Sequence, residues 1–193
     1  IVLVLVTIWA MLQAAPLEAI ADPLNSPNPA KAAWYFLGLQ ELLLHMHPLA
    51  AMGLLGVVVM ILFLVPLLDR DEQDIGIYFR SPVGKRAAIW GAALAANLAP
   101  AWVILDEYVL DIPGWLPSIS ADITTGWVPF LAILLVFVAL YFIMRRSRIY
   151  GEQRANHSEA MLGVFAFAVT GLIVLTIIGI FFRGPNMALV LPF

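Results

Sequence analysis

Residues that could carry proton chemistry are concentrated in one short stretch, WYFLGLQELLLHMH, at positions 34–47. It contains the Tyr35 phenol, the Glu41 carboxylate and the imidazoles of His45 and His47. Carboxylates and imidazoles accept protons, and imidazole also binds haem and metals. The i, i+2 spacing of the two histidines places them on different faces of a helix. We therefore interpret both as interfacial residues, with proton transfer or contact with a haem-bearing neighbour as the alternative.

The composition predicts the elements that position these residues. Of 193 residues, 63% are hydrophobic, 12% are charged and none is cysteine. Soluble domains are about 45–50% apolar and about 25% charged, so this chain has too little polar surface for a soluble fold and is predicted to lie in a membrane. The lack of cysteine excludes disulfides, thiolate metal sites, iron–sulfur clusters and CxxCH haem attachment within this sequence. We predict no metal site.

Uncharged apolar stretches indicate where the chain crosses the bilayer. A spanning helix needs about 20 apolar residues. Four stretches without charge meet this length, at residues 49–68, 87–105, 127–144 and 160–182. Residues 1–12 are a fifth apolar segment, which we expect to begin inside a helix rather than to be a signal peptide. The predicted fold is an all-α membrane protein with four to five transmembrane helices and interfacial amphipathic helices in its outer loops.

The distribution of Lys and Arg predicts the orientation. Eight of the ten lie in the loops 69–86 and 145–159, which the positive-inside rule places in the cytoplasm. Segments 13–48 and 106–126 and the C-terminus then face outward. The basic cluster Arg80, Lys85 and Arg86 is explained by this rule alone, with contact to haem propionates, anionic lipid or quinone on the inner side as the alternative. We expect His157, in the second cytoplasmic loop, to be solvated.

The outer segment 22–48 is unlike a simple linker. It is rich in proline, and its amphipathic stretch is expected to lie along the membrane interface. Residues 108–126 are expected to do the same. A short helix that anchors the loop is the simple interpretation, and a lid over a ligand site is the alternative. Because no predicted span carries a charge in its middle, a transporter is disfavoured.

Three motifs carry a family resemblance: DPLNSPNPAKAAWYFLGLQELL, LFLVPLLDRDE and IYFRSPVGKRAAIWG. In this order they resemble the C-terminal half of cytochrome b. That half is the separate subunit IV of photosynthetic bf-type complexes, and it is similarly split in some bacterial menaquinol–cytochrome c reductases. The resemblance implies a cytochrome b C-terminal-like three-helix region over residues 1–107 and an additional two-helix membrane extension over residues 108–193.

One departure from the family pattern concerns its chemistry. The family has a PEWY or PDWY motif whose carboxylate is proposed to take a proton from quinol, and here Ala32 and Ala33 precede Trp34 and Tyr35. Glu41 is our candidate for that role, with its pKa raised by burial and with Tyr35 as its hydrogen-bonding partner. The alternative is that Glu41 lies on the polar face of an interfacial helix.

The resemblance implies a membrane subunit of a quinol–cytochrome c reductase-type complex, with menaquinol as the expected quinol, that is not catalytic alone. It would form part of the outer quinol-oxidation site, with Trp34, Tyr35, Phe36 and Leu39 against the quinol. The implied partners are a haem-binding cytochrome b N-terminal subunit that holds haem b, an iron–sulfur protein and a c-type cytochrome, with no nucleic acid. The implied location is a bacterial inner or photosynthetic membrane. The alternative is a non-catalytic structural membrane anchor of a multi-subunit redox complex.

Overall fold

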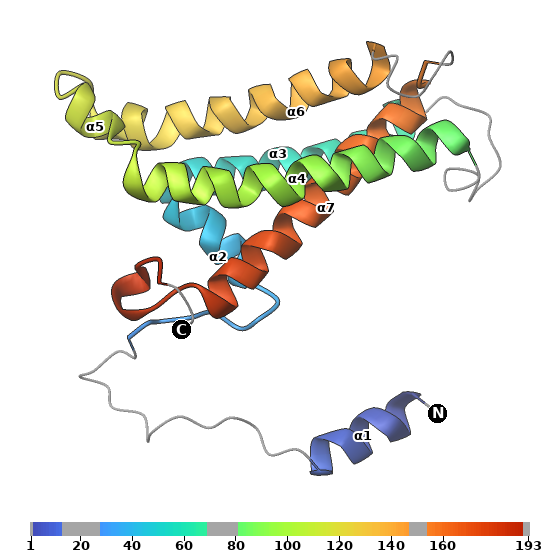
Figure 1. Cartoon of the computed structure of the whole chain (residues 1–193), viewed down its shortest axis with the longest axis horizontal. Coiled ribbons are helices and arrows are strands. Elements are labelled where there is room, and N and C mark those ends of the chain that lie inside the picture. The colour runs from blue at the N-terminus through green and yellow to red at the C-terminus, as the bar shows by residue number, and fades with distance from the viewer. Residues whose placement is uncertain (1, 13–27, 69–80, 147–153, 191–193) are drawn as a thin grey trace.

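Helices form at every position where the sequence predicts a span. The computed structural model describes residues 2–12, 28–68, 81–146 and 154–190 (Figure 1). In chain order, the elements are α1 (Val2–Leu12), α2 (Leu37–Leu44), α3 (Pro48–Leu68), α4 (Pro82–Tyr108), α5 (Ile112–Trp115), the π-helical η2 (Asp122–Trp127), α6 (Val128–Arg146), α7 (His157–Phe181) and the 3-10 turn η3 (Pro185–Met187).

Three of these stretches are long and apolar enough to cross a membrane, namely α4, α7 and the continuous helix from Asp122 to Arg146 that joins η2 to α6. The 21-residue α3 covers the predicted span 49–68, and α1 covers most of the segment 1–12. The all-α membrane fold is therefore confirmed. Short helices also form in both outer segments, where α2 and α5 were expected as interfacial helices.

Capping side chains define where α4 and α7 begin. At the start of α4, Ser81 precedes Pro82 and its hydroxyl accepts a hydrogen bond from the Gly84 N–H. At the start of α7, Asn156 and Glu159 form a reciprocal capping box. Such caps satisfy amide groups that have no partner within the helix. The Ser81 hydroxyl also donates to the Glu159 carboxylate. This contact brings the described ends of loops 69–86 and 145–159 to the same end of the bundle, as the predicted topology requires.

The crossing of α4 and α7 is built on small residues. A Cβ added at Gly91 would lie 2.1 Å from the backbone oxygen of Gly163 and one at Gly163 would lie 3.1 Å from the oxygen of Ala87. Ala87 and Ala160 are fully buried. Small residues allow helix backbones to approach closely where lipid supplies no hydrophobic driving force. The two backbones therefore touch here, and α7 crosses α4 diagonally in Figure 1.

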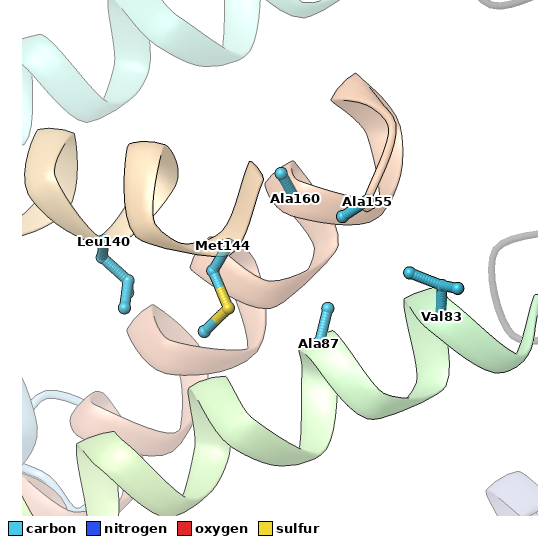
Figure 2. Packing of buried hydrophobic residues seen from close by; sticks show 6 residues of the cluster. All are labelled: Val83, Ala87, Leu140, Met144, Ala155 and Ala160. Carbon is cyan, nitrogen blue, oxygen red and sulfur yellow. The ribbon is translucent and has the colours of Figure 1, made fainter. Parts of the chain in front are cut away.

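The main apolar cluster ties α6 to this crossing. Figure 2 shows Leu140 and Met144 of α6 lying over residues from the first turns of α4 and α7. The buried members are Val83, Ala87, Leu140, Met144, Ala155 and Ala160. The cluster therefore fixes three long helices at the end of the bundle that is opposite α2. The division into regions 1–107 and 108–193 stays a prediction. In the structure, α7 of the second region packs on α4 and α2 of the first.

We expect Gly91→Ala to lower the unfolding temperature of the protein in detergent. The new methyl group would displace backbone at the α4–α7 crossing, and overpacking of this kind costs about 1–3 kcal/mol. Gly171→Ala is the matched control, because nothing lies within 4 Å of its added Cβ. An equal unfolding temperature for the two variants would contradict the close crossing.

Candidate functional site

The turn at Trp34–Phe36 is held rigidly in front of α2. The Gln40 side chain accepts from the Ala32 N–H at 2.7 Å and donates to the Ala30 oxygen at 2.8 Å. The Phe36 N–H donates to the Ala33 oxygen at 2.8 Å. These bonds pair backbone groups of residues 30–36, which precede α2, and they hold the backbone around the WYF motif.

Helix α2 packs closely on the last turns of α7. A Cβ at Gly38 would lie 2.5 Å from the Thr176 hydroxyl and 2.6 Å from the Leu172 oxygen. One at Gly179 would lie 3.4 Å from the Leu37 Cβ. Glycine on each helix thus permits this contact, and α2 is supported by a helix of the predicted extension.

The aromatic residues of the turn point outward together. Trp34 is 71% exposed, Tyr35 64% and Phe36 54%. Their rings form a continuous row, with centroids 5.7 Å apart for Trp34–Tyr35 and 4.9 Å apart for Tyr35–Phe36. Leu39, on the first turn of α2, is half-buried. Among the described residues the row is an open surface.

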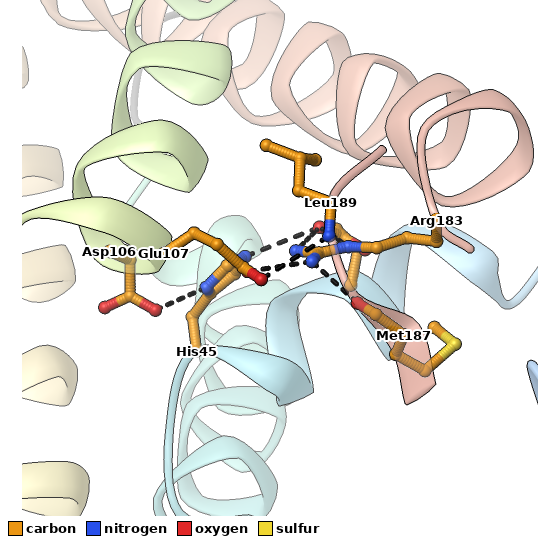
Figure 3. A network of polar contacts seen from close by, with 7 residues as sticks. His45, Asp106, Glu107, Arg183, Met187 and Leu189 are labelled. Carbon is orange, nitrogen blue, oxygen red and sulfur yellow. Dashed lines mark hydrogen bonds and ion pairs between the residues drawn. The ribbon is translucent and has the colours of Figure 1, made fainter. Parts of the chain in front are cut away.

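Behind the turn, a buried arginine gathers groups from three elements. Figure 3 shows Arg183, which follows α7, reaching toward the end of α4. Its Nε lies 3.0 Å from both oxygens of Glu41 and its Nη2 lies 2.6 Å from Oε1 of Glu41. Its Nη1 donates at 2.8 Å to both Glu107 and the Met187 oxygen. Glu41 is 0% exposed and Arg183 4%. One guanidinium therefore joins α2, α4 and the chain after α7.

A histidine links the same carboxylate to α4. His45 Nδ1 donates to Asp106 Oδ2 at 2.6 Å, since a carboxylate only accepts, and His45 Nε2 lies 3.5 Å from Glu41 Oε1. His45 is 7% exposed. Arg183 and His45 therefore lie against the three acidic groups of this site, Glu41, Asp106 and Glu107. We call these five residues the ion cluster.

The charges displace two pKa values in opposite directions. Burial raises the pKa of Glu41, but His45 and Arg183 outweigh it and hold that pKa below its ordinary 4.5. Burial lowers the pKa of His45, but the Glu41 and Asp106 carboxylates outweigh it and hold that pKa above its ordinary 6.5. Both groups are therefore stabilised in their charged forms.

Several sequence predictions need correction here. The expectation that burial would raise the pKa of Glu41 is wrong in its net result, because Arg183 contacts the carboxylate. Glu41 does not lie on a solvated face, and none of its hydrogen bonds to the described residues involves Tyr35. His45 is buried within the chain, and its place at the membrane interface stays a prediction. His157 is partly buried, and its Nδ1 lies 2.7 Å from the Tyr141 hydroxyl.

The proposed inner-face residues lie at the other end of the bundle. Lys85 and Arg86 are exposed on the first turns of α4. Arg80 lies outside the described residues. The structure therefore separates Lys85 and Arg86 from the aromatic turn by the length of the α4 helix, as the two proposed sites on opposite membrane faces require.

Sequence reasoning placed Arg183, Asp106 and Glu107 on the outer side but gave them no role in a site. Arg183 follows an uncharged stretch and is one of only two basic residues predicted to face outward. The outer segments are otherwise acidic, so the scarcity of positive charge there was a usable signal that Arg183 is paired.

An all-helical membrane domain, with a short surface helix and an exposed aromatic turn at one end, is the class that this fold defines. Residues 20–99 match the family model described as Cytochrome b(C-terminal)/b6/petD. This part of the chain is similar to the C-terminal part of cytochrome b, and the resemblance predicted from the motifs is confirmed over these residues. The match includes the aromatic turn, α2, α3 and most of α4. No curated protein and no solved structure matches the chain.

The family indicates a subunit of a bc- or b6f-type complex. Such complexes bind quinone and carry haem on the partner subunit. Together with the long apolar helices, the family indicates a multi-pass membrane protein.

We expect the stability of the ion cluster to have a maximum in pH. The contribution of Glu41 is present above its ordinary pKa of 4.5 and is lost as pH falls through its lowered folded value. That of His45 is present below 6.5 and is lost as pH rises through its raised folded value. The unfolding temperature in detergent should therefore be highest between these ordinary values.

His45→Gln tests the alkaline side of this profile. The variant should be less stable near pH 6, but its unfolding temperature should change less than that of the parent between pH 6.5 and 9. Each unit by which folding raises the pKa of His45 contributes about 1.4 kcal/mol to the free energy of unfolding at low pH. Parallel profiles for parent and variant would show that His45 is not charged in the folded protein.

Proposed function

We propose that this chain is a membrane subunit of a quinol–cytochrome c reductase-type complex and that it forms one wall of the outer quinol-oxidation site. The observation that carries the proposal is the exposed row of Trp34, Tyr35 and Phe36 within the family-matched segment. Aromatic faces offer a flat apolar surface on which a quinol ring can stack. The resemblance to split bacterial reductases favours menaquinol as the substrate.

The division of chemistry follows from what the chain contains. When quinol becomes quinone it loses two electrons and two protons. We assign the electrons to partner groups, an iron–sulfur protein and a haem-binding cytochrome b N-terminal subunit, with a c-type cytochrome as the later acceptor. This chain contributes binding and orientation by Trp34, Tyr35, Phe36 and Leu39. Proton acceptance by Glu41, with Tyr35 assisting, stays a prediction.

Two further parts of the proposal concern the membrane. The aromatic turn faces the outer side of a bacterial inner or photosynthetic membrane, and loops 69–86 and 145–159 face the cytoplasm. Lys85 and Arg86, together with Arg80, contact haem propionates, anionic lipid or quinone at the inner face. The charge distribution along the sequence supports both statements.

A structural anchor is the second candidate function. Two observations favour it: Ala33 replaces the family's carboxylate, and Glu41 is already paired with Arg183. An anchor would keep the helices and the partner contacts but would bind no quinol at the aromatic turn.

Labelling of a single cysteine distinguishes these two functions. The chain has no cysteine, so Tyr35→Cys introduces one thiol on the proposed quinol wall. We expect an inhibitor of outer-site quinol oxidation to slow maleimide labelling of Cys-substituted Tyr35 in the intact complex, because the inhibitor covers the turn. The slowing should be about tenfold at an inhibitor concentration of ten times its Kd, from simple occupancy.

The control for this experiment is Trp115→Cys. Trp115 is 60% exposed and lies on α5, outside the family-matched segment. Its labelling should be unchanged by the inhibitor. Equal labelling of the Tyr35 variant with and without inhibitor would favour the anchor over the quinol wall.

Membrane orientation can be tested with the same approach. Trp115→Cys should react with a membrane-impermeant maleimide from the outside of intact cells. Arg154→Cys, an exposed position in loop 145–159, should react only after permeabilisation. The opposite pattern would show that the positive-inside assignment is reversed.

A further inference from the structure

The ion cluster joins residues that the family match separates. Glu41 lies within the matched segment 20–99, whereas Glu107 and Arg183 lie beyond it. Among the described residues, Arg183 forms ion pairs with both Glu41 and Glu107. The arginine that pairs with Glu41 of α2 therefore comes from the chain that follows α7.

The chain after α7 also contacts the segment that precedes the aromatic turn. Lys31 Nζ donates to the Ile180 oxygen at 2.9 Å. The Asn28 side chain accepts from the Asn186 N–H at 2.5 Å and donates to the Asn186 side chain at 2.8 Å. Asn186 adopts the left-handed region, with φ of 56°, which directs its backbone N–H toward Asn28. The segment 180–187 thus contacts both α2 and residues 28–31, which precede the turn.

These contacts are arranged around Arg183. The residue forms a β-bridge with Leu189, and its guanidinium also binds the Met187 oxygen. The turn that contains Asn186 is thereby closed onto the guanidinium. A planar guanidinium with several donors fixes direction as well as distance, which a lysine ammonium does not.

We propose that Arg183 is a positioning residue of the outer quinol site. Its two-sided contact with Glu41 sets the orientation of α2 on α7, and through Gln40 and the Asn28–Asn186 pair it sets the place of the Trp34–Phe36 turn. This inference rests on the proposed quinol wall. It adds that the site depends on the chain after α7, outside the family-matched residues.

The test compares quinol oxidation by the purified complex with Arg183→Lys, Arg183→Gln and the double variant Glu41→Gln/Arg183→Gln, with rates normalised to haem b content. We expect KM for quinol to rise about tenfold in Arg183→Gln, because the displaced turn would bind quinol more weakly by about 1.4 kcal/mol. The fall in kcat should be smaller. Arg183→Lys should give an intermediate KM, because it keeps the charge but loses the fork.

The double variant protects the test against misfolding. A single substitution leaves one charge buried without its partner, whereas the double variant removes both charges. Its KM should be raised no further than that of Arg183→Gln, since the two residues act as one unit. Arg154→Gln, an exposed charge at the other end of the bundle, is the matched control and should leave KM unchanged.

The outcomes separate the two proposals. An unchanged KM in Arg183→Gln and in the double variant, in a complex that oxidises quinol normally, would overturn the positioning role and leave the quinol wall standing. A lower yield of assembled complex without a change in KM would also overturn the positioning role, because that result indicates a structural role alone. If outer-site inhibitors do not slow maleimide labelling of the Tyr35→Cys variant, both proposals are overturned.

Discussion

Burying the Arg183 guanidinium with the Glu41 carboxylate carries a desolvation cost that only close and well-directed contacts can offset. The structure provides them, with three Arg183–Glu41 donor–acceptor contacts between 2.6 and 3.0 Å and further contacts to Glu107 and Met187. The position of α2 follows from this requirement. A displacement of α2 would separate the buried Glu41 carboxylate from the Arg183 guanidinium.

The close crossing at Gly91 and Gly163 makes this contact geometrically accessible. Because the backbones of α4 and α7 touch near one end, α7 can diverge diagonally and deliver Arg183 beneath α2 while the end of α4 supplies Glu107 (Figures 1 and 3). Gly38 then allows α2 to rest against α7. Small residues at the helix contacts and charged residues at their ends therefore belong to one arrangement.

The sequence predicts the helices well and the ion cluster poorly, for physical reasons. Uncharged stretches such as 160–182 must form helices in a bilayer, so α7 follows from hydropathy alone. The Trp34–Phe36 motif was also found, because a family pattern marks it. Arg183 and Glu41 are 142 residues apart, and no local periodicity reports such a pairing. The sign of the Glu41 pKa shift was missed for the same reason, since the prediction considered burial of the carboxylate but not its partner Arg183.

Binding of a quinol ring and acceptance of its protons make different demands on this end of the molecule. In the proposed quinol wall, the quinol ring would stack on Trp34, Tyr35 and Phe36, whose rings are already exposed. Glu41 accepts hydrogen bonds from Arg183 at both oxygens, so it would have to give up part of that contact before it could bind a proton. With Ala33 in place of the family's carboxylate, the proposal therefore assigns the two functions to different residues: the aromatic turn would hold the substrate, and the buried glutamate would hold the turn.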